Sequence, residues 1–306
     1  MNTKEWALIA YTILTQMSVG AFVVLGLAHT YALRKAGEKQ ANALSNRALL
    51  AIGPVLVLAT LASLFHLGNP TNAYRAISNI GSSWLSREIL LTLLFIGAGG
   101  VFAIMQWRQI GEFRVRQAIA VVAAIIGLGL VFSMAQVYQL RAEPAWDTAA
   151  TPVLFFTTAF LLGALAVGVA FVATYTYLKS RVSSDELGQL SDLLRDTLRW
   201  IAVGSIVLLG VELVIIPLYV STLATGGPTA IASVDKMIGD YGVVFALRLI
   251  LGFIGAGLFG LFLYRSAVLN RQNVMITAVY AAFALVLVAE VLGRFLFYAS
   301  QARIGL

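Results

Sequence analysis

Long apolar runs separated by short polar breaks dominate the sequence and predict eight membrane-spanning helices. Each run is long enough for the roughly 20 apolar residues that cross the hydrocarbon core of a bilayer. We therefore expect an all-α integral membrane bundle, organised as a single domain over residues 1–306, with both termini on one side. The predicted spans are residues 6–33, 48–66, 88–107, 117–140, 152–178, 198–222, 241–264 and 273–299.

Two segments between the spans carry signals of their own. Ser183 and Glu186 stand at capping-box spacing before leucines at helical intervals, which predicts a separate short helix lying on the membrane surface over residues 183–199. Residues 223–240 contain Gly226, Gly227 and Pro228, and we expect a flexible or partner-facing loop there.

Composition supports a membrane protein and excludes several classes of function. Hydrophobic residues make up 60% of the chain and charged residues only 11%, whereas soluble domains have about 25% charged residues. Eight spans leave no room for a soluble catalytic domain. The net charge of +7 is explained by basic loops, so binding to nucleic acid is not expected.

The distribution of basic residues between loops predicts the orientation. Thirteen of the 21 Lys and Arg residues fall in the loops after the first, third, fifth and seventh spans, and six fall on the opposite side. Cytoplasmic loops are enriched in Lys and Arg. We therefore expect both termini outside, which for a bacterial source means a multi-pass inner-membrane protein with periplasmic termini.

His66 and Glu88 are the candidate catalytic pair. His66 closes the second span and Glu88 opens the third, so both lie at the predicted outer interface. Either residue could be a satisfied interface residue, but an acid and a histidine at one depth also suit quinol oxidation. That reaction needs a hydrophobic pocket for the ring, hydrogen-bond partners for its two hydroxyls, and groups that accept the two released protons.

Other residues near these helix ends complete the expected quinol-binding pocket, which spans 1 to 4 would form. Gln16 and Tyr138 either line this cavity or only bond between helices. The residues expected around the ring, besides His66 and Glu88, are Trp84, Ser86, Arg87, Tyr74, Gln16 and Tyr138.

Four further charges lie inside predicted spans. Glu290 and Arg294 share a helix face at i and i+4 and are expected to form an ion pair, and Glu212 and Arg248 could pair between neighbouring spans. These pairs are either structural or part of a proton or ligand pathway. They motivate a less favoured alternative, a secondary transporter or proton channel, although the inverted repeats typical of transporters are not visible.

The sequence predicts no metal, haem or other cofactor on this chain. It contains no Cys, and its two His residues do not stand at metal-ligand spacing. His29 lies near the inner end of the first span and His66 near the outer end of the second. Two axial haem ligands would need similar depth, so a bis-His haem is excluded.

Residues 66–89, HLGNPTNAYRAISNIGSSWLSREI, resemble the membrane-anchor subunits of the dimethyl sulfoxide reductase family. The matching pattern is His-Leu-Gly-x-Pro-x-x-Ala, followed by a Ser-rich stretch and Leu-Ser-x-Glu-Ile. The first span and the segment from Tyr138 to Phe156 also look similar, as does the end from Glu290 to Tyr298, more weakly. The resemblance is vaguer between residues 180 and 280.

The resemblance implies a specific function. Such anchors have eight spans with termini outside, carry no cofactor, and hold a four-cluster iron–sulfur subunit and a molybdopterin catalytic subunit at the membrane. They oxidise menaquinol in anaerobic respiration, and His66 and Glu88 would stand at the quinol site. Related anchors serve sulfur-oxyanion oxidoreductases that reduce quinone instead, and a purely structural anchor is a further alternative.

Overall fold

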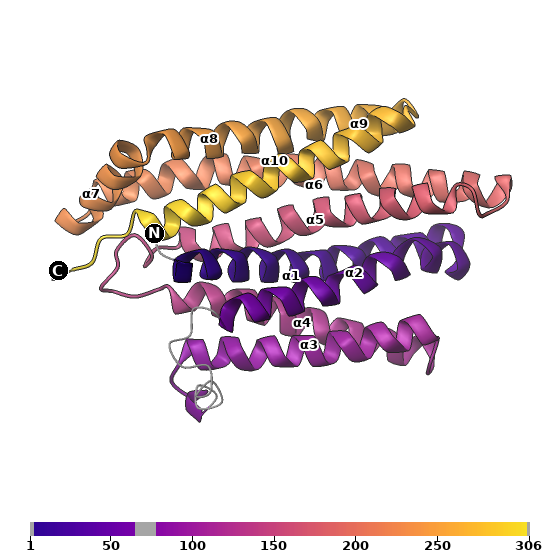
Figure 1. Ribbon diagram of the computed structural model, residues 1–306, viewed down its shortest axis with the longest axis horizontal. Helices are drawn as coiled ribbons and strands as arrows, with labels where there is room; N and C mark the ends of the chain where they lie inside the picture. The colour runs from indigo at the N-terminus through magenta and orange to yellow at the C-terminus, as the bar shows by residue number, and fades with distance from the viewer. Residues whose placement is uncertain (1–2, 65–77, 305–306) are drawn as a thin grey trace.

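The computed structural model describes residues 3–64 and 78–304, which form an elongated all-helical bundle with no strand in those ranges (Figure 1). Eight helices of the described chain are long and apolar enough to cross a membrane, as the sequence predicted. The helices are α1 (Thr3–Ala36), α2 (Glu38–Leu64), α3 (Trp84–Arg108), α4 (Phe113–Val137), α5 (Ala150–Leu178), α6 (Ser184–Ala224), a continuous run of α8 (Gly242–Gly252), η3 (Phe253–Phe259) and α9 (Gly260–Val268), and α10 (Gln272–Ala299).

The observed helices extend beyond the predicted apolar runs. Apart from α6, the largest difference is α2, which begins at Glu38, well before residue 48. A hydropathy pattern detects only the part of a helix that is apolar, whereas the helix itself continues past the membrane surface. Gly37, with φ of +84°, makes the turn between α1 and α2, because glycine adopts this left-handed conformation without strain.

The prediction of a separate surface helix at 183–199 is wrong, because α6 runs through it without a break. Ser183 does cap this helix, since its Oγ accepts a hydrogen bond from the Glu186 backbone N–H at 3.4 Å. The leucine stripe, however, faces protein: Leu190, Leu194 and Leu198 are each at most 2% exposed. Burying that stripe against the bundle stabilises α6 as an extension of the span.

The segment 223–240 is mostly helical and not an irregular loop, whereas its facing a partner stays a prediction. Pro228 starts the short helix α7 (Pro228–Asp235), and the π-turn η2 (Lys236–Asp240) follows it. Proline favours the first helical position because its fixed φ suits a helix and its missing N–H is not needed there. Lys236 Nζ also donates to the Gln301 carbonyl oxygen at 3.0 Å, which ties this segment to the C-terminal tail.

The centre of the bundle is the close contact between α1 and α5. A Cβ atom added at Gly20 would lie 1.8 Å from the Ala159 carbonyl oxygen, and one at Gly163 would lie 2.3 Å from the Gly20 carbonyl carbon. Only glycine, which has no Cβ atom, lets the two helix backbones approach this closely. In Figure 1, α3 and α4 lie on one side of this pair, and α6, α8, α9 and α10 lie on the other.

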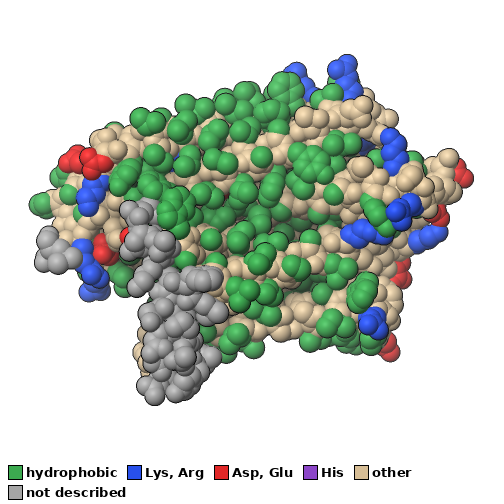
Figure 2. Space-filling model, viewed as in Figure 1, with side chains coloured by type: hydrophobic (Ala, Val, Ile, Leu, Met, Phe, Trp, Pro, Cys, Tyr) green, Lys and Arg blue, Asp and Glu red, His purple; other side chains and the backbone are tan. Residues whose placement is uncertain are grey.

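The bundle has two distinct ends. The first turn of α1 and the last turn of α10 lie together at one end, which we call the terminal end (Figure 1). The turns at Gly37, Gly111 and residues 179–183 and 269–271 lie at the other, which we call the loop end. Figure 2 shows a broad hydrophobic surface between them, with Lys and Arg side chains gathered at the loop end of the visible face.

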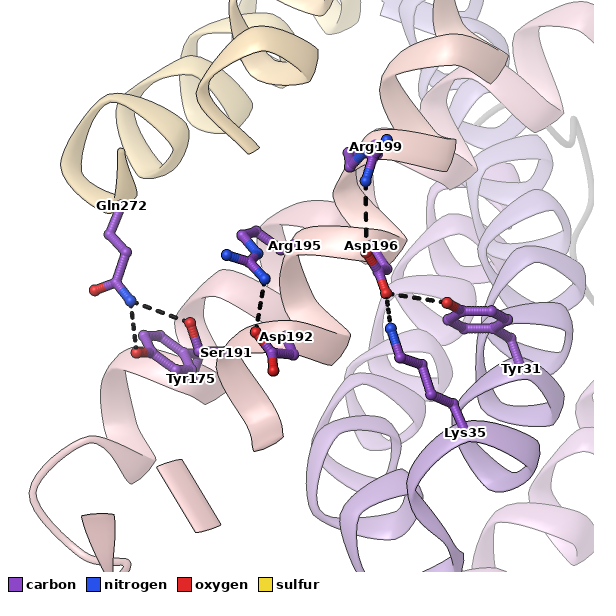
Figure 3. Close-up of polar contacts among 9 residues, drawn as sticks. All are labelled: Tyr31, Lys35, Tyr175, Ser191, Asp192, Arg195, Asp196, Arg199 and Gln272. Atoms are coloured by element: carbon purple, nitrogen blue, oxygen red, sulfur yellow. Dashed lines mark hydrogen bonds and ion pairs between the residues drawn. The ribbon is translucent and has the colours of Figure 1, made fainter. Parts of the chain in front are cut away.

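Polar contacts join the helices at the loop end (Figure 3). Asp196 of α6 accepts hydrogen bonds from the Tyr31 hydroxyl, at 3.0 Å, and from Lys35 Nζ, both on α1. Gln272 Nε2 of α10 donates to the Tyr175 hydroxyl and Ser191 Oγ, each at 3.1 Å. These contacts fix α1, α5, α6 and α10 to one another at the end where the chain turns.

Candidate functional site

The start of α3 places an acidic side chain inside the terminal end of the bundle. Ser83 has extended backbone angles and caps the helix, since its Oγ accepts from the Ser86 N–H at 3.3 Å. A serine before the first turn satisfies a backbone donor that the helix leaves open. The cap fixes where α3 begins, so Ser86 and Glu88 point into the bundle, where they are 3% and 6% exposed.

Glu88 is surrounded by hydroxyl groups. The Tyr11 hydroxyl of α1 lies beside the Glu88 carboxyl group and is 3.2 Å from Thr92 Oγ1. Thr92, one turn along α3, donates to the backbone carbonyl of Glu88 at 2.8 Å. Within the described ranges, no Lys, Arg or His nitrogen lies within 4.0 Å of the Glu88 carboxylate. The acid is therefore buried without a counter-charge from those residues.

Arg87 and Trp84 lie at the surface beside this acid. Arg87 donates to the carbonyl oxygens of Ile80, at 2.9 Å, and Gly81, at 2.8 Å, and its guanidinium lies 4.3 Å from the centre of the Trp84 ring. Arg87 thus closes the turn before α3 and does not pair with its neighbour Glu88. Trp84 in turn packs edge-on against Phe132 of α4.

Tyr138 lies at the end of α4 in an aromatic cluster near the acid. Its hydroxyl is 2.6 Å from that of Tyr298 on α10, and its ring contacts Trp146, Phe155 and Phe297. Tyr138 therefore bonds between helices, and its place in a quinol pocket stays a prediction.

Gln16 lies deeper in α1 and belongs to a different cluster. It is fully buried, and its Oε1 accepts a hydrogen bond from Arg294 Nη2 at 2.9 Å. The Arg294 guanidinium also stacks on Phe155, with 3.8 Å between its Cζ and the ring centre. The structure thus places Gln16 with α5 and α10, apart from Trp84, Ser86 and Arg87.

The expected ion pair between Glu290 and Arg294 is not observed. Among the described residues, the ion pairs within 4.0 Å do not include this one, because Arg294 bonds to Gln16 and Glu290 instead accepts from Thr158 Oγ1 at 2.6 Å. The spacing places both groups on one helix face but does not fix which partners they select on neighbouring helices. Glu212 and Arg248 do approach each other, at 4.0 Å.

His66 and Tyr74 lie outside the described residues, so their places in the site remain predictions. Among the described residues, sequence reasoning missed Tyr11, Thr92 and Tyr298. Two of them follow a helical spacing: Thr92 comes four residues after Glu88, and Tyr298 four residues after Arg294. A polar residue one helical turn from a buried charge lies on the same helix face, so this spacing could have identified both residues from the sequence.

This arrangement can hold and transfer a proton. A buried carboxyl group beside a phenol, with no cation within 4.0 Å among the described residues, binds a proton more readily than an exposed carboxyl group does. It lies at the first turns of α3, close to the terminal end, so a proton can leave without crossing the bundle. Those are the properties that a general base for a reduced ring hydroxyl needs.

The family model and the full-length relatives name the same kind of subunit. The family model described as DMSO reductase anchor subunit (DmsC) matches residues 1–300. The chain is 26% identical to anaerobic dimethyl sulfoxide reductase chain YnfH of Escherichia coli K12 over 99% of its length and 96% of the relative's. It is also 26% identical to an anaerobic dimethyl sulfoxide reductase chain of Haemophilus influenzae, with 100% and 99% covered.

A further relative matches only part of the chain. A sulfite dehydrogenase subunit of Allochromatium vinosum is 28% identical, over 56% of this chain and 54% of the relative. The match of the family model from the first residue to the end of α10 covers every helix described above. This chain belongs to the family of DMSO reductase anchor subunits.

Proposed function

We propose that this chain anchors a molybdopterin oxidoreductase to the inner membrane of a bacterium and oxidises a quinol, menaquinol by the family resemblance, at the terminal end of the bundle. The observation that carries the proposal is Glu88, which is buried at the start of α3 beside the hydroxyl groups of Tyr11 and Thr92. Glu88 accepts a proton from the quinol, and His66, contributed by the segment before α3, accepts or orients the other hydroxyl.

The terminal end faces the periplasm in this proposal, because the basic residues gather at the loop end and basic loops stay in the cytoplasm. An iron–sulfur subunit would dock on the segments exposed there, and a catalytic subunit with molybdopterin would bind through it. The chain itself would carry no haem or other cofactor, so electrons pass from the quinol directly to the partner's clusters.

The docking surface at this end is held in place by contacts between distant segments. The Arg303 Nε lies 3.1 Å from Glu143 Oε1, and the Ile304 N–H donates to the Ala142 carbonyl oxygen at 3.0 Å. The C-terminal tail is therefore fixed against the segment between α4 and α5. A partner would meet a preformed surface there, which lowers the entropy lost on binding.

The test compares quinol-dependent with dye-dependent turnover of the purified complex. Glu88→Gln keeps the shape of the side chain but removes its ability to accept a proton, so quinol-dependent turnover should fall about a hundredfold. Turnover with a soluble reduced dye, which bypasses the membrane subunit, should stay unchanged. His66→Ala should show the same split.

Glu112→Gln is the matched control, because Glu112 is an exposed acid at the loop end, directly before α4. It should leave both activities unchanged. Normal quinol turnover in the Glu88 variant would contradict the assignment, and loss of both activities would mean that the complex no longer assembles.

A second candidate function follows from the sulfite dehydrogenase relative. Anchors of that kind would deliver electrons from a sulfur substrate to quinone, with Glu88 supplying a proton to the ring. The direction of electron flow separates the two. Purified complex that reduces a quinone analogue when given sulfite, and fails to reduce dimethyl sulfoxide with a quinol analogue, would favour this second function.

A further inference from the structure

A second group of buried charges lies on the other side of α1 from Glu88, between α5, α6, α8 and α10. Glu212 of α6 and Glu290 of α10 are 5% and 3% exposed. Arg248 of α8 approaches Glu212 to 4.0 Å, and Arg294 of α10 lies one turn from Glu290. The mechanism proposed for Glu88 uses none of these four groups.

The two carboxyl groups line the same small cavity. Two ionised carboxylates that face one small cavity repel each other and have no hydrogen to share, so a bond between them needs one proton. Thr158 Oγ1 donates to Glu290 Oε2, which leaves the other oxygens of the pair for that proton and for solvent. Glu212 Oε1 has no hydrogen-bond partner in the described structure.

Two cavities flank this pair. A small one of about 10 Å³ is lined by Glu212, Glu290 and Arg248, and a larger one of about 40 Å³ is lined by Glu290, Arg248 and Arg294. One water molecule needs a cavity of roughly 10–15 Å³, so the smaller cavity has room for about one water and the larger for about three. They are too small for a quinone ring, and their polar walls suit water.

The larger cavity leads from the pair toward the terminal end. Its deep wall contains Glu290 and Thr158, and its outer wall contains Ala150, the first residue of α5, Met237 of η2 and Ser300, the residue after α10. The lining therefore extends from the buried carboxyl pair to the ends of three helical segments. Water in this cavity would connect the pair to the aqueous phase there.

We propose that Glu212 and Glu290 form a proton-binding site that holds one shared proton and exchanges it with the aqueous phase at the terminal end through the water-sized cavity. Burial and mutual repulsion hold the proton on the pair, whereas the two arginines favour its release. The other ionisable groups that line the larger cavity beside the pair are Arg248 from α8, Arg294 from α10 and the Tyr219 phenol from α6. With both arginines charged, the site carries one positive charge when protonated and is neutral when the proton leaves.

This site does not depend on the quinol reaction. Glu88 contacts α1, whereas the pair is enclosed by α5, α6, α8 and α10, so either site can be altered without touching the other. The site can therefore be tested in the purified full-length chain, with no electron donor present.

The infrared stretch of a protonated carboxylic acid gives a direct measurement. The measurement uses a Glu88→Gln background, which removes the buried carboxyl group of the quinol site. This chain should show such a band at neutral pH, and it should shift promptly in D₂O because the cavity admits solvent. Adding Glu212→Gln or Glu290→Gln should abolish it, because the remaining acid of the pair, relieved of its like-charged neighbour, ionises beside Arg248 and Arg294. A band that persists after either addition, or one that does not exchange in D₂O, overturns the proposal.

Gly293 offers an independent test through the position of Arg248. A Cβ atom added at Gly293 would lie 2.5 Å from Arg248 Nε, so Gly293→Ala must displace this flexible side chain from its observed place beside Glu212. Losing a nearby cation favours the protonated form, and the pH at which the band disappears should rise by about one unit. Arg248→Gln should raise it in the same direction.

Gly242→Ala, at the first residue of α8, is the matched control, since nothing lies within 4 Å of its added Cβ and it lines neither cavity. It should leave the midpoint unchanged. An unshifted midpoint in both Gly293→Ala and Arg248→Gln would contradict a proton held beside Arg248.

Discussion

The hydroxyl oxygens of Tyr138 and Tyr298 lie 2.6 Å apart, although 160 positions separate the two residues in the sequence. This bond joins the end of α4 to the end of α10 at the terminal end of the bundle. Both rings also pack against Phe297, and Trp146 Nε1 donates to the Phe297 carbonyl oxygen at 2.7 Å. The aromatic cluster thus links the two halves of the bundle next to the candidate site.

Removing either tyrosine hydroxyl should destabilise the bundle. Tyr298→Phe takes from the Tyr138 hydroxyl the partner that lies 2.6 Å away, which should lower the free energy of unfolding by about 1–3 kcal/mol. Tyr138→Phe should have a similar effect, because the Tyr298 hydroxyl loses the same bond. Thermal unfolding of the purified protein in one detergent would measure both.

The double variant supplies the check. If the hydroxyls bond to each other, Tyr138→Phe with Tyr298→Phe should destabilise the protein by less than the sum of the single effects. Additive effects would mean that the two hydroxyls do not interact.

The sequence was sufficient to predict the membrane-spanning helices, since an apolar run long enough to span a bilayer has few other stable structures. The sequence did not predict the bounds of a helix correctly where an apolar part is followed or preceded by a polar part. The segment 183–199 has the amphipathic pattern of a surface helix, but its leucines pack on the bundle as part of α6. A stripe of leucines has the same pattern whether lipid or protein covers it.

The candidate site was predictable only in part, for a related reason. Glu88 was identifiable because an acid near a membrane span is unusual, whereas position alone could not decide whether Tyr138 lines a cavity or only bonds between helices. Tyr11 was not identifiable, because a single tyrosine in an apolar helix gives no sign of the helix it faces. The predicted Glu290–Arg294 pair failed likewise: side-chain partners across helices depend on packing that spacing within one helix cannot reveal.

The contact between α1 and α5 predicts a steep effect of one methyl group. In Gly20→Ala the new Cβ would overlap the Ala159 backbone, which cannot move without separating the helices. We expect the yield of folded protein in the membrane to fall at least about tenfold, since overpacking against backbone costs about 1–3 kcal/mol or more.

Gly26→Ala is the control on the same helix. Nothing lies within 4 Å of the position that its Cβ would take, and the residue is exposed. This variant should accumulate at the wild-type level, because alanine is the better helix former. Equal losses in the two variants would show that α1 tolerates no alanine for reasons unrelated to α5.

Two aspartates of α6 at the loop end should differ in their importance (Figure 3). Asp196 joins α6 to Tyr31 and Lys35 of α1, whereas Asp192 pairs only with Arg195, one turn away on its own helix, at 2.7 Å. Asp196→Asn should lower the free energy of unfolding by about 1 kcal/mol, and Asp192→Asn by less than about 0.5 kcal/mol.

High salt provides a second measurement for the same pair of variants. Screening weakens exposed ion pairs, so the difference between Asp196→Asn and the wild type should shrink as salt is added. Neither variant should change quinol-dependent turnover, because both positions lie at the end of the bundle opposite Glu88. A turnover defect in Asp196→Asn would show that the two ends are coupled.

The orientation of the bundle can be measured directly because the sequence contains no cysteine. A single cysteine introduced at Thr225, exposed at the terminal end, or at Glu112, exposed at the loop end, would be the only thiol on the chain. With the basic loop end in the cytoplasm, a maleimide that cannot cross membranes should label Thr225→Cys in intact spheroplasts. Glu112→Cys should be labelled only after the membrane is permeabilised. The reverse pattern would place Glu88 on the cytoplasmic side, so protons from the quinol would be released there and the partner subunits would have to dock in the cytoplasm.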